Sequence, residues 1–170
     1  MVTIILPGYS SHNKIWLEET AKQIKVDGEI RPIYWGHWTD PEIKFDVKEK
    51  ARLLDTVSGK RVTDIIAKSI GTLAASYVIR KSPEKIRKVI LNGIPLNDLS
   101  ESDKGIVKSA LKLVSSENVI CFQNEEDPHG GFDQTKNFLS GINSEIKVIS
   151  KNRNDHEYPY VEDFNKFLLG

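Results

Sequence analysis

The stretch DIIAKSIGTLAAS, residues 64–76, places Ser69 between a short apolar run and a run of small residues. Ala67 stands two positions before this serine, and Gly71 stands two positions after it. A sharp turn from a strand into a helix needs small residues at those positions, and it lifts the central side chain above the sheet. Ser69 is therefore a candidate nucleophile, although the same pattern also suits a serine that merely caps a helix.

A serine nucleophile needs a base to accept its proton and an acid to orient that base. The loop QNEEDPHG follows the fifth apolar run of the chain, and the loop KNRNDHEYPY follows the sixth. We predict that Asp127 is the acid, because Pro128 fixes the turn after it, and that His156 is the base. Glu126 is the alternative acid.

The other reactive side chains have simpler interpretations. His12 and His37 are expected to be solvated residues, with His37 farther from the site, whereas His129 would line the rim beside the acid. The one cysteine, Cys121, lies in the apolar run NVICF and is predicted to be a buried structural thiol. No two histidines have the spacing of metal ligands, so the sequence predicts neither a metal site nor a cofactor.

Acyl transfer to a serine creates an oxyanion, which backbone N–H groups can stabilise. One N–H would come from Ile70, directly after the candidate nucleophile, and the other from Tyr9, after the first apolar run. Gly8 would let this loop approach a substrate closely, and the Ser10 hydroxyl could add a donor. The stretch PGYSSHN is equally compatible with a plain strand-to-helix turn.

Short apolar runs alternate along the chain with amphipathic segments that suit helices. The apolar runs are residues 2–6, 30–35, 62–67, 88–92, 118–122 and 146–150, and the helical segments lie near residues 13–25, 47–58, 71–82, 104–114, 132–141 and 159–169. This alternation predicts an α/β fold with three layers, in which a mostly parallel six-stranded sheet lies between two layers of helices.

Two of the apolar runs carry features of edge strands. Pro32 cannot donate to a strand ladder, and Lys147 lies in a run that alternates between apolar and polar residues. We therefore predict the strand order 2-1-3-4-5-6. In that order the chain reverses direction between strands 1 and 3, so the ligand crevice is expected between their carboxyl ends, where Ser69 lies.

The composition excludes some partners. Lys plus Arg equals Asp plus Glu, 24 each, so no net charge attracts nucleic acid or an anionic membrane. No apolar run has the length of a signal or membrane segment. A chain of 170 residues fits a single domain, residues 1–170, which we expect to be cytoplasmic and to act on a small-molecule or surface-displayed substrate. The sequence does not indicate an oligomeric state.

Taken together, these segments resemble the α/β-hydrolase superfamily, and in particular the small lidless serine hydrolases related to retinoblastoma-binding protein nine. The resemblance spans nearly the whole chain and rests on IILPGYS, AKSIGTLAA, NEEDPHG and NDH. It implies a reduced α/β-hydrolase fold without a cap domain. It also implies a catalytic triad of Ser69, Asp127 and His156, with Tyr9 and Ile70 at the oxyanion hole.

Some positions depart from the family pattern and bear on substrate preference. Ala67 stands where relatives carry glycine, Lys68 stands where His or Asn is common, and the first strand ends in PG where many relatives have HG. The connection GIPLNDLSESDKG is too short for a cap, although Ile94 could belong to a small apolar flap. The predicted substrate contacts are Gly8, Ser10, Lys68, Ile94 and His129.

The function implied by the resemblance is hydrolysis of small or exposed acyl esters through an acyl-enzyme intermediate. A peptidase or amidase would use the same triad, and a catalytically idle interaction protein would keep the same fold, so both alternatives stay open. A flavodoxin-like binder of flavin or phosphate is the weaker alternative, because the loop PGYSSHNK has no repeated glycine pattern.

Overall fold

The computed structural model describes residues 1–48, 59 and 61–170, and the strands of this part form one sheet. The strands are β1 (Val2–Leu6), β2 (Glu29–Pro32), β3 (Thr63–Lys68), β4 (Ile86–Asn92), β5 (Val119–Asn124) and β6 (Lys147–Lys151). Their order is β2-β1-β3-β4-β5-β6, and each neighbouring pair is parallel. The predicted strand order is thus confirmed, with the Pro32 strand and the Lys147 strand at the two edges.

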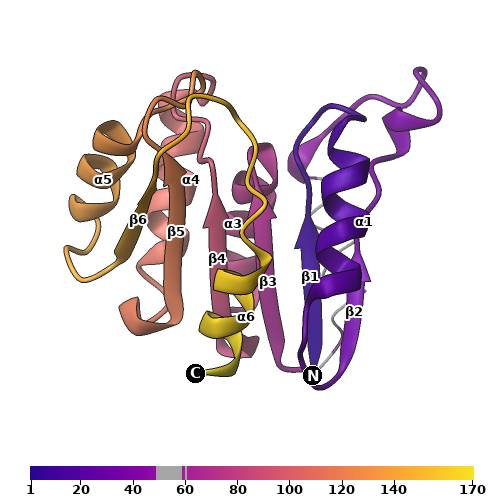
Figure 1. Ribbon diagram of the computed structural model, residues 1–170, viewed down its shortest axis with the longest axis horizontal. Helices are drawn as coiled ribbons and strands as arrows, with labels where there is room; N and C mark the ends of the chain where they lie inside the picture. Colours follow the sequence, from indigo (N-terminus) through magenta and orange to yellow (C-terminus); the bar gives the residue numbers. More distant parts are fainter. Residues whose placement is uncertain (49–58, 60) are drawn as a thin grey trace.

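The helices connect the strands and cover both faces of the sheet (Figure 1). They are α1 (Asn13–Gln23), α3 (Ile70–Lys81), α4 (Glu101–Leu111), α5 (Phe132–Ser140) and α6 (Val161–Leu169), with short 3-10 turns at η1 (Gly36–Trp38), η2 (Pro83–Lys85) and η3 (Ser116–Asn118). The helix predicted near residues 47–58 lies almost entirely outside the described residues. The other five predicted helices are present.

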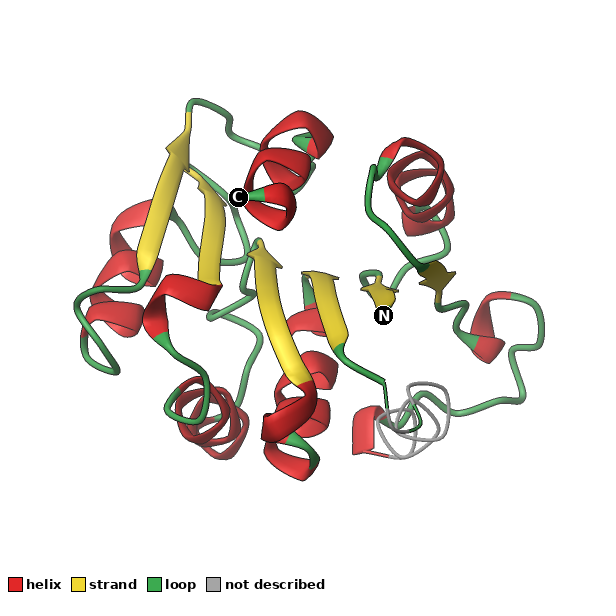
Figure 2. Cartoon of the chain, turned by 90° about the horizontal axis from the view of Figure 1, so that it is seen from below, coloured by secondary structure: helices red, strands yellow, loops and turns green. Residues whose placement is uncertain are grey.

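Successive side chains of each strand point to opposite faces, which divides the core into two layers. In β1, Ile4 and Leu6 pack on one side with α3, α4 and α5, whereas Ile5 packs on the other with α1 and α6. Figure 2 shows the helices on either side of the sheet. Every residue of β1, β3 and β5 is buried, as expected for strands covered on both faces. The predicted three-layer α/β architecture is confirmed.

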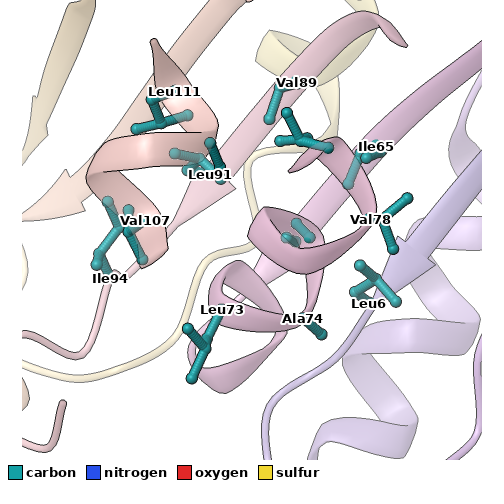
Figure 3. Packing of buried hydrophobic residues seen from close by; sticks show 14 of the residues in the cluster. Leu6, Ile65, Leu73, Ala74, Val78, Val89, Leu91, Ile94, Val107 and Leu111 are labelled. Carbon is teal, nitrogen blue, oxygen red and sulfur yellow. The ribbon is translucent and has the colours of Figure 1, made fainter. Parts of the chain in front are cut away.

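Helix α3 packs closely on the middle of the sheet because small side chains lie on the face that contacts the strands. Ala74 and Ala75 are fully buried there, and Leu73 and Val78 extend the contact toward neighbouring elements (Figure 3). This position brings the first residue of the helix, Ile70, directly above the end of β3.

The connection between β4 and α4 comprises residues 93–100 and holds no cap. Helix α4 begins three residues earlier than the apolar pattern predicts, because the Ser100 side chain accepts a hydrogen bond from the backbone N–H of Asp103 and caps the helix. No helix among the described residues has the length and apolarity needed to cross a bilayer.

Candidate active site

Ser69 occupies a strained turn between β3 and α3. Its backbone angles are φ 56° and ψ −128°, and no other non-glycine residue of the described chain has a positive φ. Such a conformation costs about 1–3 kcal/mol and persists only where the surroundings hold it in place. The Ser69 N–H donates a 2.9 Å hydrogen bond to the carbonyl of Asn92 on β4, which anchors the turn to the neighbouring strand.

The residues on either side of the turn leave no room for larger side chains. A Cβ atom at Gly71 would lie 2.4 Å from the carbonyl oxygen of Leu6 and 2.8 Å from that of Pro7. Ala67 is fully buried on β3. The small residues flanking Ser69 therefore let the start of α3 approach the end of β1, as the sequence pattern predicts.

Asp127 and His156 meet at the carboxyl ends of β5 and β6. The Nδ1 atom of His156 donates to Oδ2 of Asp127 at 2.7 Å. The backbone N–H of His129 donates to the other carboxylate oxygen at 2.8 Å. Because the carboxylate fixes which imidazole nitrogen carries the proton, Nε2 of His156 is left as the acceptor in the neutral ring. Glu126, the alternative acid, is exposed.

Tyr158 is a partner of Asp127 that the sequence analysis missed. Its hydroxyl donates to Oδ2 of Asp127 and accepts from the N–H of Asn124 at 3.2 Å. Burial raises the pKa of Tyr158 well above its ordinary value, so the hydroxyl stays protonated and remains a donor. The ring lies against Gly93, whose φ is 59° and where a Cβ would come within 2.4 Å of the ring.

The charge on Asp127 is stabilised despite its burial. Burial by itself would raise the pKa of this carboxyl group, but the hydrogen bonds from His156 and Tyr158, together with the N–H of His129, outweigh that effect and lower the pKa. The group is therefore a carboxylate at neutral pH, which is the form needed to hold an imidazole in one orientation.

Ser69 and His156 are not hydrogen-bonded to each other in this structure. The Nε2 atom of His156 is buried and has no hydrogen-bond partner among the described residues. Two of the three predicted triad residues, Asp127 and His156, are thus hydrogen-bonded to each other. Nε2 of His156, the atom that would accept the proton of Ser69, is unpaired within the described chain. In ligand-free enzymes, contacts of this kind often tighten only when substrate binds.

The loop after β1 is held by indole groups from the chain beyond β2. Nε1 of Trp35 donates to the carbonyl oxygens of Pro7 at 3.3 Å and Gly8 at 3.0 Å, and Nε1 of Trp38 donates to that of Tyr9 at 2.7 Å. Three consecutive carbonyl groups are thus engaged on one side of the loop. These anchors lie nearly thirty residues from the loop along the chain, and no local signal in the sequence predicts them.

His37 adds to this anchoring and is not the remote solvated residue that the sequence suggested. Its Nε2 atom donates to the Tyr9 carbonyl at 2.8 Å, and its ring stacks on the Tyr9 ring at 4.6 Å. No acceptor for the N–H of Tyr9 or of Ile70 is found in the described part of the chain.

Lys68 has its side chain buried on the face of the sheet that α1 covers. Its side chain is only 2% exposed, its Nζ atom donates to Glu157 at 2.8 Å, and the ammonium group lies over the ring of Trp16 on α1. Burial lowers the pKa of Lys68, and the nearby carboxylate of Glu157 opposes that shift. The structure thus gives this predicted substrate contact a protein partner.

A groove of about 710 Å³ opens beside Ser69. Its described lining comprises Tyr9, Lys44, Phe45, Asp46, Val47, Lys48, Ser69, Ile70, Leu73, Tyr77, Pro95, Asp98, Asp103 and His129. Of the predicted substrate contacts, His129 lines this groove, whereas Ile94 is fully buried in the core beneath it. Gly8 is buried, and the exposed Ser10 hydroxyl contacts the ring of His12.

No group of three or more His, Cys, Asp or Glu side chains in the described chain is arranged to hold a metal ion. Cys121 is buried on β5, and burial raises the pKa of its thiol far above the ordinary value. A thiol in this state is a poor nucleophile. Among the described residues, the groove at this edge of the sheet is lined by Ser69 and His129, and the ring of His156 lies 4.4 Å from that of His129.

Similar architectures occur among solved structures. An esterase from Exiguobacterium antarcticum superposes with a TM-score of 0.70 at 12% identity, over 99% of this chain and 90% of the esterase. A lidless α/β serine hydrolase from Xanthomonas campestris superposes with a TM-score of 0.67 at 13% identity, over 98% of this chain and 78% of the hydrolase. Mouse α/β hydrolase domain-containing protein 10 superposes with a TM-score of 0.63 at 15% identity, over 98% of this chain and 87% of the mouse protein.

The chain has the fold of the lidless α/β hydrolases. No protein-family profile matches the sequence, and no curated protein matches it. The resemblance seen in the sequence is therefore confirmed at the level of the α/β-hydrolase fold. At 12–15% identity this likeness does not identify a substrate.

Proposed function

We propose that this protein is a serine hydrolase that cleaves small or exposed acyl esters through a Ser69–His156–Asp127 triad. The observation that carries the proposal is the backbone of Ser69, which is held at a positive φ at the end of a central strand. Strain of this kind is retained where the position of a side chain matters for function. The hydrogen-bonded pair of Asp127 and His156 at the same edge of the sheet supplies an acid and a base.

The reaction proceeds in two halves. His156 Nε2 accepts the proton of Ser69 as the serine oxygen attacks the ester carbonyl carbon, and Asp127 stabilises the imidazolium that forms. The N–H groups of Tyr9 and Ile70 donate to the oxyanion. The C–O bond to the alcohol then breaks, and His156 gives its proton to the departing alkoxide. Water, which gives a proton to His156, attacks the acyl carbon of the acyl-enzyme. The bond to the serine oxygen then breaks, His156 returns the proton to that oxygen, and the carboxylic acid and free Ser69 are released.

The groove supports substrates of modest size. Ile70, Leu73 and Tyr77 follow one another along one side of α3, which gives the acyl group an apolar surface next to the nucleophile. The exposed Tyr9 ring borders the groove, and the connection after β4 is too short to place a domain over it. These features favour short acyl groups or an acyl group displayed on a larger molecule.

The first test is covalent labelling with a fluorophosphonate probe, which reacts with activated serines. Intact protein should be labelled at one site, and Ser69→Ala should abolish labelling. Ser109→Ala removes a helix hydroxyl that bonds to the Ile106 carbonyl, and it should leave labelling unchanged. Labelling that persists in Ser69→Ala would place the nucleophile elsewhere.

The second test compares hydrolysis of a nitrophenyl ester, the matching nitroanilide and an acyl thioester by the wild type, Ser69→Ala and His156→Ala. We expect the ester to be the best substrate and both variants to lose several orders of magnitude in kcat. A nitroanilide cleaved faster than the ester would favour the amidase alternative. Absence of both labelling and turnover in the folded wild type would favour the idle interaction protein.

A further inference from the structure

A second Asp–His pair lies beside the proposed base. Nδ1 of His129 donates to Oδ2 of Asp98 at 2.5 Å, and the ring of His129 lies 4.4 Å from the ring of His156. His129 is itself held in place, because its backbone N–H donates to Asp127 and its carbonyl accepts from the N–H of Asn97 at 2.9 Å. The imidazole therefore has a set orientation even though nearly half of its surface is exposed.

The location of His129 places it next to the alcohol part of a bound ester. His129 lines the groove together with Ser69, and its ring contacts that of His156. In ester hydrolysis the base is also the group that returns a proton to the leaving alcohol. The alcohol part of the substrate must therefore lie next to His156, and so within reach of the imidazole beside it.

The hydrogen bond to Asp98 decides what His129 can recognise. Because a carboxylate only accepts, Nδ1 carries the proton, and Nε2 of the neutral ring is an acceptor. An acceptor at this place suits a hydroxyl group on the leaving alcohol. The carboxylate of Asp98, which bonds to the same imidazole, would repel a negatively charged alcohol placed against His129. The rest of the groove carries charges of both signs, from Lys44, Lys48, Asp46 and Asp103.

We propose that His129, oriented by Asp98, is a specificity-determining residue that binds a hydroxyl group on the leaving alcohol, so that the preferred substrates are acyl esters of neutral polyols. This inference rests on the proposed function, since it concerns the alcohol side of the same site. It assigns no step of the proton transfer to His129. Loss of the imidazole should therefore change the choice between esters more than the turnover of a plain alkyl ester.

The test uses a matched pair of substrates, glycerol 1-butyrate and propyl butyrate, which share the acyl group and differ in the two hydroxyls of the alcohol. Wild type should favour the glycerol ester in kcat/KM by about fivefold, the amount expected from one hydrogen bond. His129→Leu and Asp98→Ala should bring the ratio close to one. Glu101→Ala removes an exposed carboxylate of α4 that is paired with Lys104, and it should keep the wild-type ratio.

The outcomes separate this inference from the proposed function. Equal use of both esters by the wild type, or a ratio that is unchanged in His129→Leu, would overturn the inference while Ser69-dependent turnover continued. A loss of turnover on both esters in His129→Leu, with a normal melting temperature, would also overturn it, because His129 would then act in the chemistry. If the wild type cleaves neither ester and takes up no fluorophosphonate, the proposed function fails and the inference fails with it.

Discussion

Lys68 and Glu157 form an ion pair between the residue before the candidate nucleophile and the residue after the candidate base, with Nζ and Oε2 2.8 Å apart. Lys68 is the last residue of β3, and Glu157 lies in the loop after β6. The pair therefore joins the two backbone segments that carry Ser69 and His156. The Lys68 side chain is buried and the Glu157 side chain is exposed, so the buried ammonium group restrains the position of the Glu157 loop.

This link predicts that Lys68→Met slows turnover without loss of stability. Methionine fills about the same space and removes a buried charge, and the Glu157 carboxylate left without its partner is exposed to water rather than buried. The His156 loop loses its tie to β3, however, and a displacement of about 1 Å can cost up to 100-fold in rate. We expect kcat to fall about tenfold, with KM and the melting temperature nearly unchanged.

The matched control is Lys88→Met. Lys88 lies near the opposite end of the sheet, in β4, and its Nζ atom donates to the carbonyl of Phe167 at 2.6 Å. Its loss should lower the free energy of unfolding by about 1 kcal/mol and leave kcat intact. Equal kcat values for Lys68→Met and the wild type would show that the ion pair does not position the base.

The strain at Ser69 can be measured with two variants that both lack the hydroxyl. Ser69→Ala keeps the Cβ atom and hence the unfavourable φ of 56°, whereas Ser69→Gly relieves it. We expect the glycine variant to be the more stable by about 1 kcal/mol, or about 2–4 °C in melting temperature. Both should be inactive. A glycine variant that melts below the alanine variant would argue against stored strain at this turn.

The close approach of α3 to β1 predicts that Gly71→Ala is severely destabilising. The new Cβ would lie 2.4 Å from the carbonyl oxygen of Leu6, and the backbone of β1 would have to shift to relieve this clash. We expect a loss of about 3 kcal/mol or more in urea unfolding. Gly105→Ala, inside α4 with open space around it, should instead gain about 0.5–1 kcal/mol. Similar effects at the two positions would refute the steric account of the elbow.

The contact between Tyr158 and Asp127 predicts a stability difference that depends on pH. The folded-state pKa of Asp127 lies below the value of about 3.9 for an unfolded carboxyl group. The charged Asp127 carboxylate therefore contributes its full stabilisation of the folded state above about pH 3.9, and this stabilisation is lost as the pH falls through the lower folded-state pKa. Tyr158→Phe removes one donor to the carboxylate, so its deficit of about 1–2 kcal/mol at neutral pH should shrink as the pH falls below about 3.9.

Tyr160→Phe is the control for this pH series. The hydroxyl of Tyr160 donates to Oδ1 of Asn124 at 2.6 Å and does not contact Asp127. Its deficit, measured by urea unfolding across the same range, should stay nearly constant. If Tyr158→Phe also shows a constant deficit, the hydrogen bond to Asp127 does not stabilise the carboxylate.

Much of the architecture follows from patterns that are local in the sequence. Each apolar run forms a strand, Pro32 marks one edge and Lys147 the other, and small residues flank the turn at Ser69. The strand order then carries Asp127 and His156 to the same edge of the sheet without any knowledge of side-chain contacts. These features are accessible because they depend on the two-residue period of strands and on backbone sterics.

The side-chain contacts around the site were harder to foresee. The direction of Lys68 could have been read from the strand period, because it lies two residues after Ile66 and shares the face covered by α1 and α6. The hydrogen bond from Tyr158 to Asp127 and that from Trp38 to the loop after β1 join segments about thirty residues apart. Such contacts depend on loop conformations, which residue types alone do not specify.

The short connection after β4 has a kinetic consequence. Hydrolases of this fold often carry their cover at that place, and residues 93–100 are too few to form one. If the protein is the hydrolase proposed above, this connection forms no cover that an oil–water boundary would have to displace from Ser69. The velocity should therefore rise smoothly with ester concentration and show no jump at the point where the ester begins to form droplets.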